Sequence, residues 1–172
     1  AKDFELAIQW LLDCGLIHKV NRVSKPALPL KAYLNLDAFK IYLLDIGLLI
    51  AMTDLDARVI IDGNRIFTEF KGALTEQYVL QQLISEVGVL PYYYSTENSS
   101  GEIDFMVQGK TSVIPIEVKA EENLRAKSLK MFCEKYHPKY AIRTSMSDYR
   151  EQEWMTNIPL YHIDRVKKYM EE

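Results

Sequence analysis

The sequence predicts an α/β fold in which a central mixed sheet is flanked by helices. Of its 172 residues, 48% are hydrophobic and 26% are charged, so the chain can bury a sizeable core and is not a disordered tail. From residue 66 onward, helical and strand patterns follow one another in the order α-β-β-β-α-β, and a last strand and helix come after them. Two of these strands are separated only by a short polar run, which predicts a β-hairpin.

The N-terminal part of the chain predicts a helix, two strands and a second, short helix. Residues 3–14 carry one apolar face, residues 17–23 and 39–44 have strand patterns, and Asp45 is expected to cap a helix over 46–52. A helix followed by two strands is typical of the second half of a winged helix. A helical and hairpin lid on the main domain is the alternative interpretation.

The rest of the chain is interpreted with the same periodicities. Residues 54–63 are expected to form a connector, because an Asp-Gly pair at its end favours a turn. The elements predicted after it are a long helix over 66–87, strands over 92–94, 102–107 and 113–118, a helix over 124–135, strands over 139–143 and 160–163, and a final helix from Asp164.

Two neighbouring strands carry the residues that suggest chemistry. Side chains alternate between the faces of a strand, so Glu117 and Lys119 project together from one face at the end of the strand predicted over 113–118. In the preceding strand the same alternation places Asp104 on the face opposite to its apolar neighbours. The residues expected to point into the core are Ile114, Ile116 and Val118 in one strand and Ile103, Phe105 and Val107 in the other.

Two registers of the hairpin satisfy this alternation. In one register Asp104 faces Pro115 and lies diagonal to Glu117, and in the other Asp104 faces Glu117 directly. A register shifted by one residue from either of these would turn every side chain of one strand to the opposite face and expose its apolar residues. Both allowed registers place Asp104, Glu117 and Lys119 on one face of the sheet.

The shared face of Asp104 and Glu117 predicts a site for one hard divalent cation. Mg²⁺, or Mn²⁺ in its place, suits this pair because Mg²⁺ takes one or two carboxylates and keeps several waters. Such an ion polarises a phosphodiester and lowers the pKa of a bound water, and Lys119 is expected to lie near that water or to stabilise the transition state. Glu76, on an otherwise small or apolar helix face, is expected to complete the site, and Gly72 is expected to let that helix approach the sheet.

Several segments of the chain resemble one known family. The runs GEIDF, PIEVKA and KSLKMF are similar to the PD-(D/E)xK nuclease superfamily. With SKPALPLKAY, FKIYLLDIGLL and EFKGALTEQYV they resemble, more specifically, the domain of unknown function at the C-terminus of prokaryotic AAA-type ATPases. These runs occupy residues 101–105, 115–120, 127–132, 24–33, 39–49 and 69–79, so the resemblance covers nearly the whole chain.

This resemblance implies a restriction endonuclease-like core over residues 54–172. A partial winged helix and a connector helix over residues 1–53 would precede that core, and both would follow an ATPase domain. The residues that the resemblance assigns by position are Asp104 and Glu117 as the metal-binding acids, Lys119 as the lysine of the superfamily and Glu76 as its helix glutamate.

The chain departs from the pattern of this family in two ways. Ile103 stands before Asp104, so the proline-aspartate pair in the name of the superfamily is absent. No GxxxxGK[ST] loop occurs in the sequence, so ATP would bind only to an ATPase part outside this chain. The chain begins at Ala1 rather than at methionine, and we expect it to be a fragment of a longer protein.

The leading functional prediction is Mg²⁺-dependent hydrolysis of phosphodiester bonds, with DNA as the favoured nucleic acid. The alternative is a catalytically inert module, derived from a nuclease, that binds nucleic acid or a protein and reports to the ATPase. A net charge of -3 and a pI near 5.7 are not those of a general nucleic-acid binder, so contacts must come from a local patch. Lys127 and Lys130 are the best candidates for phosphate contacts, with Arg143 beyond them, although a solvated basic helix face is the alternative.

The cysteines and the apolar segments predict the compartment. Cys14 and Cys133 lie far apart and form no CxxC spacing, which favours a reduced, cytoplasmic protein. The longest apolar stretch, residues 41–52, is shorter than the roughly 20 residues that a membrane span needs, so no membrane partner is expected. An oligomer is compatible with the sequence.

Overall fold

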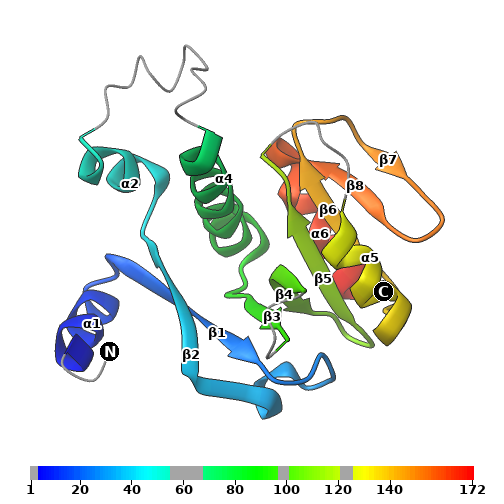
Figure 1. The fold of residues 1–172 in the computed structure, drawn as a ribbon, viewed down its shortest axis with the longest axis horizontal. Coiled ribbons are helices and arrows are strands. Elements are labelled where there is room, and N and C mark those ends of the chain that lie inside the picture. Colours follow the sequence, from blue (N-terminus) through cyan, green and yellow to red (C-terminus); the bar gives the residue numbers. More distant parts are fainter. Residues whose placement is uncertain (1–3, 55–67, 97–100, 121–125) are drawn as a thin grey trace.

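The structure, a computed structural model, describes residues 4–54, 68–96, 101–120 and 126–172 (Figure 1). From residue 55 onward the predicted connector lies outside these residues. Within them, no helix is both long and apolar enough to cross a membrane. The α-helices are α1 (Glu5–Asp13), α2 (Ile46–Met52), α4 (Thr68–Gln82), α5 (Lys127–Tyr136) and α6 (Val166–Glu171), a π-helical turn (Leu83–Val87) continues α4, and 3-10 turns span Leu30–Tyr33 and Leu160–Arg165.

Eight strands form a single mixed sheet in the order β2-β1-β3-β4-β5-β6-β8-β7. The pairs β1–β3, β5–β6 and β6–β8 are parallel, and the other neighbouring pairs are antiparallel. The predicted α/β fold with a central mixed sheet and flanking helices is therefore confirmed. The strands are β1 (Ile17–Val23), β2 (Leu34–Leu43), β3 (Tyr92–Ser95), β4 (Glu102–Gln108), β5 (Val113–Val118), β6 (Ile142–Ser145), β7 (Arg150–Glu151) and β8 (Thr156–Pro159).

Two hydrophobic cores cover the two faces of this sheet. One core contains buried residues of α4 and its π-helical turn, together with Ile114 of β5 and Ile142 of β6. The other contains buried residues of α5, together with Val113 and Ala141. Because Val113 and Ile114 are adjacent in a strand, they point to opposite faces, so α4 and α5 cover opposite sides of the sheet (Figure 1).

The N-terminal hairpin continues this sheet. β1 pairs antiparallel with β2 and parallel with β3, and Figure 1 shows the hairpin crossing one side of the molecule with α4 beside it. β2 begins at Leu34, earlier than the strand predicted over 39–44. Asp45 caps α2 as predicted, because its side chain accepts a hydrogen bond from the backbone N–H of Leu48 at 2.7 Å. The assignment of residues 1–53 to a partial winged helix stays a prediction.

One predicted strand is wrong. Residues 160–163 lie in a 3-10 turn, and the strand that precedes them, β8, escaped the sequence interpretation. The pattern hid β8 because Asn157 is polar and yet fully buried. Its side-chain amide donates to two backbone carbonyls of the preceding loop and its Oδ1 accepts from Ser145. Hydrogen bonding, rather than hydrophobicity, therefore makes this position compatible with the core.

Gln77 joins the edge strand β2 to α4. Its Oε1 accepts a hydrogen bond from the backbone N–H of Leu43 at 3.0 Å, and its Nε2 donates to the carbonyl of the same residue at 2.8 Å. The side chain is buried. It therefore satisfies both backbone groups at the end of an edge strand, where no further strand can pair with them.

Replacing Gln77 should loosen this junction. Gln77→Leu should lower the free energy of unfolding by about 1–3 kcal/mol, because both backbone groups of Leu43 lose their partner. Chemical denaturation measures the change. Gln82→Leu is the matched control, since Gln82 lies in the same helix and its side chain makes no hydrogen bond to the described residues. Equal losses in the two variants would contradict the role of Gln77.

Candidate functional site

β4 and β5 are paired in the second of the two registers that the sequence allows. Phe105 pairs with Ile116 and Met106 pairs with Pro115, and the paired positions end at Phe105. The next residue, Asp104, is joined to β5 through its side chain, because its Oδ2 atom accepts a hydrogen bond from the backbone N–H of Val118 at 2.7 Å.

A bulge in β4 breaks the alternation that the sequence predicts for this strand. The pairing of β3 with β4 shifts by one residue along the strand. As a result, Ile103 packs in the core beside α5, whereas Phe105 and Val107 pack in the core beside α4. The predicted common face of these three residues is wrong. Asp104 lies at the bulge, where the strand passes from one core to the other.

Glu117 and Lys119 form a close ion pair at the end of β5. The Nζ atom of Lys119 lies 2.6 Å from Oε1 of Glu117. Glu117 is only 4% exposed, and its second oxygen, Oε2, is buried without a hydrogen-bond partner among the described residues. A buried carboxylate oxygen without a donor is costly, so this atom is suited to accept a cation or a polar ligand.

Asp104 lies in an environment that disfavours its charged form. Burial, the charge of Glu117 and the charge of Glu76 together raise the pKa of Asp104 to about 8, in that order of importance. The N–H of Val118 and the ammonium of Lys40 act in the opposite direction but do not compensate. The charged form of Asp104 therefore lacks compensating positive charge, which an additional cation would supply.

Lys40 and Tyr42 reach the site from β2, and the sequence interpretation missed both. Lys40 Nζ forms a short ion pair with Glu102 Oε1 and lies 3.7 Å from Glu76 Oε2. The hydroxyl of Tyr42 donates to the same Glu76 oxygen at 3.1 Å. Burial and then Glu76 raise the pKa of Tyr42 above its usual value, so it stays a neutral donor. The alternation of β2 indicates only that Lys40 and Tyr42 lie on one face of that strand. It does not show that this face meets Glu76 of α4.

A buried polar row continues from Glu117 across the neighbouring strands. Arg143 on β6 is paired in register with Glu117, and Asn157 on β8 is paired with Arg143. The Nε of Arg143 donates to Oδ1 of Asn157 at 2.9 Å. Burial and the charge of Arg150 lower the pKa of Arg143. The proposed phosphate contact of Arg143 is wrong, because this residue is only 1% exposed. Its side chain instead forms a buried hydrogen bond within the sheet.

The two lysines that were predicted to contact nucleic acid lie at the start of α5. Lys127 and Lys130 are both exposed, and neither forms an ion pair within the described part of the chain. The predicted close approach at Gly72 is wrong, because a Cβ atom added there would meet no atom of the described residues within 4 Å. Glu76 does lie beside the other acids, so α4 supplies the predicted carboxylate without a close approach at Gly72.

The donor set fits one hard divalent cation. Asp104 and Glu117 supply carboxylate oxygens, and in the described part of the chain Oε2 of Glu117 has no hydrogen-bond partner. Across the described residues, no three His, Cys, Asp or Glu side chains are grouped closely enough to hold a metal together. Mg²⁺ does not need three such ligands, because it binds through one or two carboxylates and keeps several waters.

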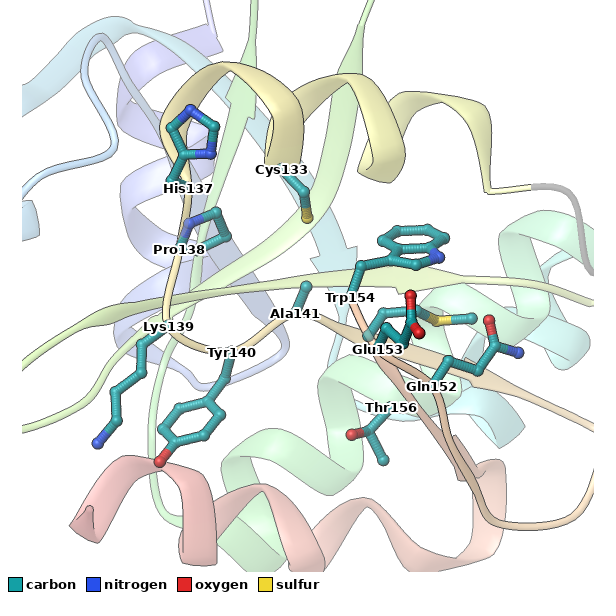
Figure 2. A pocket seen from close by; sticks show the side chains of 11 residues that line it. Cys133, His137, Pro138, Lys139, Tyr140, Ala141, Gln152, Glu153, Trp154 and Thr156 are labelled. Atoms are coloured by element: carbon teal, nitrogen blue, oxygen red, sulfur yellow. The ribbon is translucent and has the colours of Figure 1, made fainter.

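A separate concavity lies between the C-terminal end of α5 and the turn that precedes β8 (Figure 2). It holds about 390 Å³. Burial raises the pKa of the Cys133 thiol in its wall to about 11, so this thiol is not an activated nucleophile. In Figure 2, Lys139 and Glu153 lie on opposite sides of the opening and do not converge on one point. The acidic residues of β4 and β5 remain the better candidate.

Two family models match the chain. Residues 71–163 match a domain of unknown function, DUF4143, and residues 1–59 match another domain of unknown function, DUF8612. No match was found among curated proteins or among solved structures. The first segment contains Glu76, Asp104, Glu117 and Lys119, whereas the second contains Lys40 and Tyr42. The candidate site therefore takes side chains from both matched segments.

The raised pKa of Asp104 predicts that the stability of the metal-free protein depends on pH. The folded state keeps a proton on Asp104 up to a pKa of about 8, whereas the unfolded chain releases it near pH 4. Stability should therefore fall as pH rises between these values, since folding then requires proton uptake.

Asp104→Asn should remove this part of the pH dependence. In the presence of EDTA at pH 8 it should raise the melting temperature by several degrees, because roughly 1 kcal/mol corresponds to about 2–4 °C for a domain of this size. Asp37→Asn, at an exposed position of β2, is the control and should leave the profile unchanged. A less stable Asp104→Asn protein at pH 8 would show that the carboxylate is well compensated.

Proposed function

The chain belongs to the DUF4143 family of domains of unknown function, and from its site we propose that it is a metal-dependent phosphodiesterase of the PD-(D/E)xK type. One observation carries the proposal. Oε2 of Glu117 is buried without a hydrogen-bond partner among the described residues, and the pKa of the neighbouring Asp104 is raised by burial and then by its acidic neighbours. A buried and a half-buried carboxylate with too little positive charge beside them require a cation to be stable in their charged forms.

The charges of the site indicate the valence of this cation. Four carboxylates and two ammonium groups interact here, so the formal charge is -4 + 2 = -2 once Asp104 has lost its proton to serve as a ligand. One divalent cation neutralises this charge. Asp104 and Glu117 would hold Mg²⁺ or Mn²⁺, with waters as the remaining ligands. The groups counted are Glu76, Glu102, Asp104 and Glu117, with Lys40 and Lys119.

The side chains around the cation have separate roles. When bound, the cation polarises a phosphodiester and lowers the pKa of a coordinated water. Lys119 lies against Glu117, so its ammonium can orient the attacking water or stabilise the charge that develops on the phosphate oxygens. Glu76 adds negative charge beside Asp104 and anchors Tyr42. Hydrolysis adds water to phosphorus, breaks the bond to the leaving sugar oxygen and transfers a proton to that oxygen.

DNA is the substrate that we favour. The resemblance of residues 101–105 and 115–120 to nuclease-like domains of prokaryotic AAA-type ATPases supports DNA, a cytoplasmic location and an ATPase part of the same parent protein as partner. Lys127 and Lys130, exposed at the start of α5, would contact the phosphate backbone.

A second candidate function is a catalytically inert interaction module. The observation that favours it is Lys40, whose ammonium already lies among the acidic side chains. A net charge of -3 also gives the chain little general attraction for nucleic acid. Such a module would keep the fold of a nuclease, bind nucleic acid or a protein and report to the ATPase.

Metal binding is the first test of the phosphodiesterase proposal. Calorimetry should detect one Mn²⁺ per chain in the wild type, and the double variant Asp104→Asn, Glu117→Gln should lose this binding because both charged ligands become neutral amides. The matched control carries the same changes at exposed acids, Asp37→Asn and Glu134→Gln, and should bind as the wild type does. Equal binding by both double variants would place the metal elsewhere.

Cleavage tests the role of Lys119. Lys119→Ala should reduce the cleavage rate of DNA in Mg²⁺ or Mn²⁺ at least a hundredfold, because the developing charge loses a nearby ammonium. Lys110→Ala, in the exposed turn between β4 and β5, should cleave normally. Thermal melts of both variants check the fold. Undiminished cleavage by Lys119→Ala would contradict the mechanism, and Mn²⁺ binding without any cleavage by the wild type would favour the inert module.

A further inference from the structure

The ammonium group of Lys40 lies where acidic side chains from two different elements converge. Its Nζ contacts Oε1 of Glu102 on β4 and lies 3.7 Å from Oε2 of Glu76 on α4. The same atom lies 5.2 Å from the ring centroid of Tyr93. The side chain is only 26% exposed, so an enclosed cation faces these carboxylates in the metal-free protein.

Lys40 interacts with most of the negative charge of the site. The charges of Glu76, Glu102 and Asp104 all act on its ammonium, whereas Lys119 is held against Glu117 at the other side of Asp104. Without Lys40, Glu76, Glu102 and Asp104 would lose the ammonium whose charge acts on all three. Lys40 therefore makes the acidic cluster compatible with a folded, metal-free state.

A lysine is suited to leave such a position. Its charge lies at the end of a flexible four-carbon chain, so the ammonium can move while the backbone stays in place. The backbone of β2 is held by Gln77, which bonds both polar groups of Leu43, and by the hydroxyl of Tyr42 on Glu76. Replacement of the Lys40 ammonium by another cation would thus require the movement of one side chain and not of the whole hairpin.

We propose that Lys40 is the internal counter-ion of the acidic site and that a divalent cation binds in competition with it. This inference rests on the proposed function, in that it takes Asp104 and Glu117 as the metal ligands. The charge of Asp104 acts on the Lys40 ammonium and would also bind the incoming cation, so the two positive charges repel each other beside Asp104 and part of the metal's binding free energy is used to displace Lys40. The segment that carries β2 therefore sets the metal affinity of a site whose ligands lie on β4 and β5.

Metal affinity of the full chain tests the competition. Calorimetric titration with Mn²⁺ should give at least tenfold tighter binding for Lys40→Met than for the wild type, which is about 1.4 kcal/mol. Lys40→Arg keeps the charge and should stay within a fewfold of the wild type. Lys19→Met is the matched control, because Lys19 lies in the same hairpin and contacts the ring of Phe39. Its affinity should be unchanged.

The outcomes separate this inference from the proposed function. Mn²⁺ binding that depends on Asp104 and Glu117 but is equal or weaker in Lys40→Met would overturn the competition alone. Absence of Mn²⁺ binding in both the wild type and Lys40→Met would overturn the competition and the metal-dependent function together. Tighter binding in Lys40→Met and in Lys19→Met alike would reduce the effect to net charge and would also overturn the role of Lys40.

A labelling experiment on the wild type avoids any loss of folding in a variant. Acetic anhydride modifies accessible lysines, and mass spectrometry gives the extent of modification of Lys40 relative to Lys19. Saturating Mn²⁺ should increase the relative reactivity of Lys40 severalfold, because the ammonium leaves its acidic partners, and the Asp104→Asn, Glu117→Gln protein should show no increase. A ratio that stays constant while calorimetry records Mn²⁺ binding would overturn the proposal.

Discussion

The pairing of β4 with β5 is the constraint on which the candidate site depends. It brings Asp104 close enough to Glu117 for their charges to interact and lets the Asp104 carboxylate accept a hydrogen bond from the N–H of Val118. A slip by one residue would move every apolar side chain of the two strands to the wrong core, so packing on both faces of the sheet fixes this register. The proximity of the two carboxylates is thus a consequence of hydrophobic packing, which must outweigh their mutual repulsion.

The bulge in β4 determines what else can reach these carboxylates. Because Ile103 and Phe105 enter different cores, Asp104 lies where the strand crosses between them. Glu117 can then act on Asp104 from β5, while Glu76 and Lys40 act on it from α4 and β2. A regular strand would present Asp104 to one face only. The irregularity is therefore part of the site, as bulges beside functional groups commonly are.

Local periodicity was sufficient to predict that Glu117 and Lys119 lie together, because strand alternation places both on one side of β5. It was not sufficient for β4, where the bulge breaks the alternation beside Asp104. It was not sufficient for Lys40, whose place in the site follows from the packing of β2 on α4 and not from any pattern within β2. The same reason explains the wrong strand over 160–163. Asn157 is buried by hydrogen bonds, and periodicity recognises burial only where the buried residues are apolar.

The negative charge of the site has a consequence for any anionic substrate. In the metal-free protein a phosphodiester would meet a formal charge of -3 + 2 = -1 while Asp104 holds its proton, and of -2 once Asp104 ionises, on a chain whose own net charge is -3. A bound divalent cation would remove that repulsion, and an ammonium displaced from Glu76 and Glu102 would become available to a phosphate oxygen. Binding of metal and binding of substrate would then favour each other, since linkage between two ligands is reciprocal. An acidic domain can in this way act on nucleic acid without an extended basic surface, provided that the metal enters first or together with the substrate.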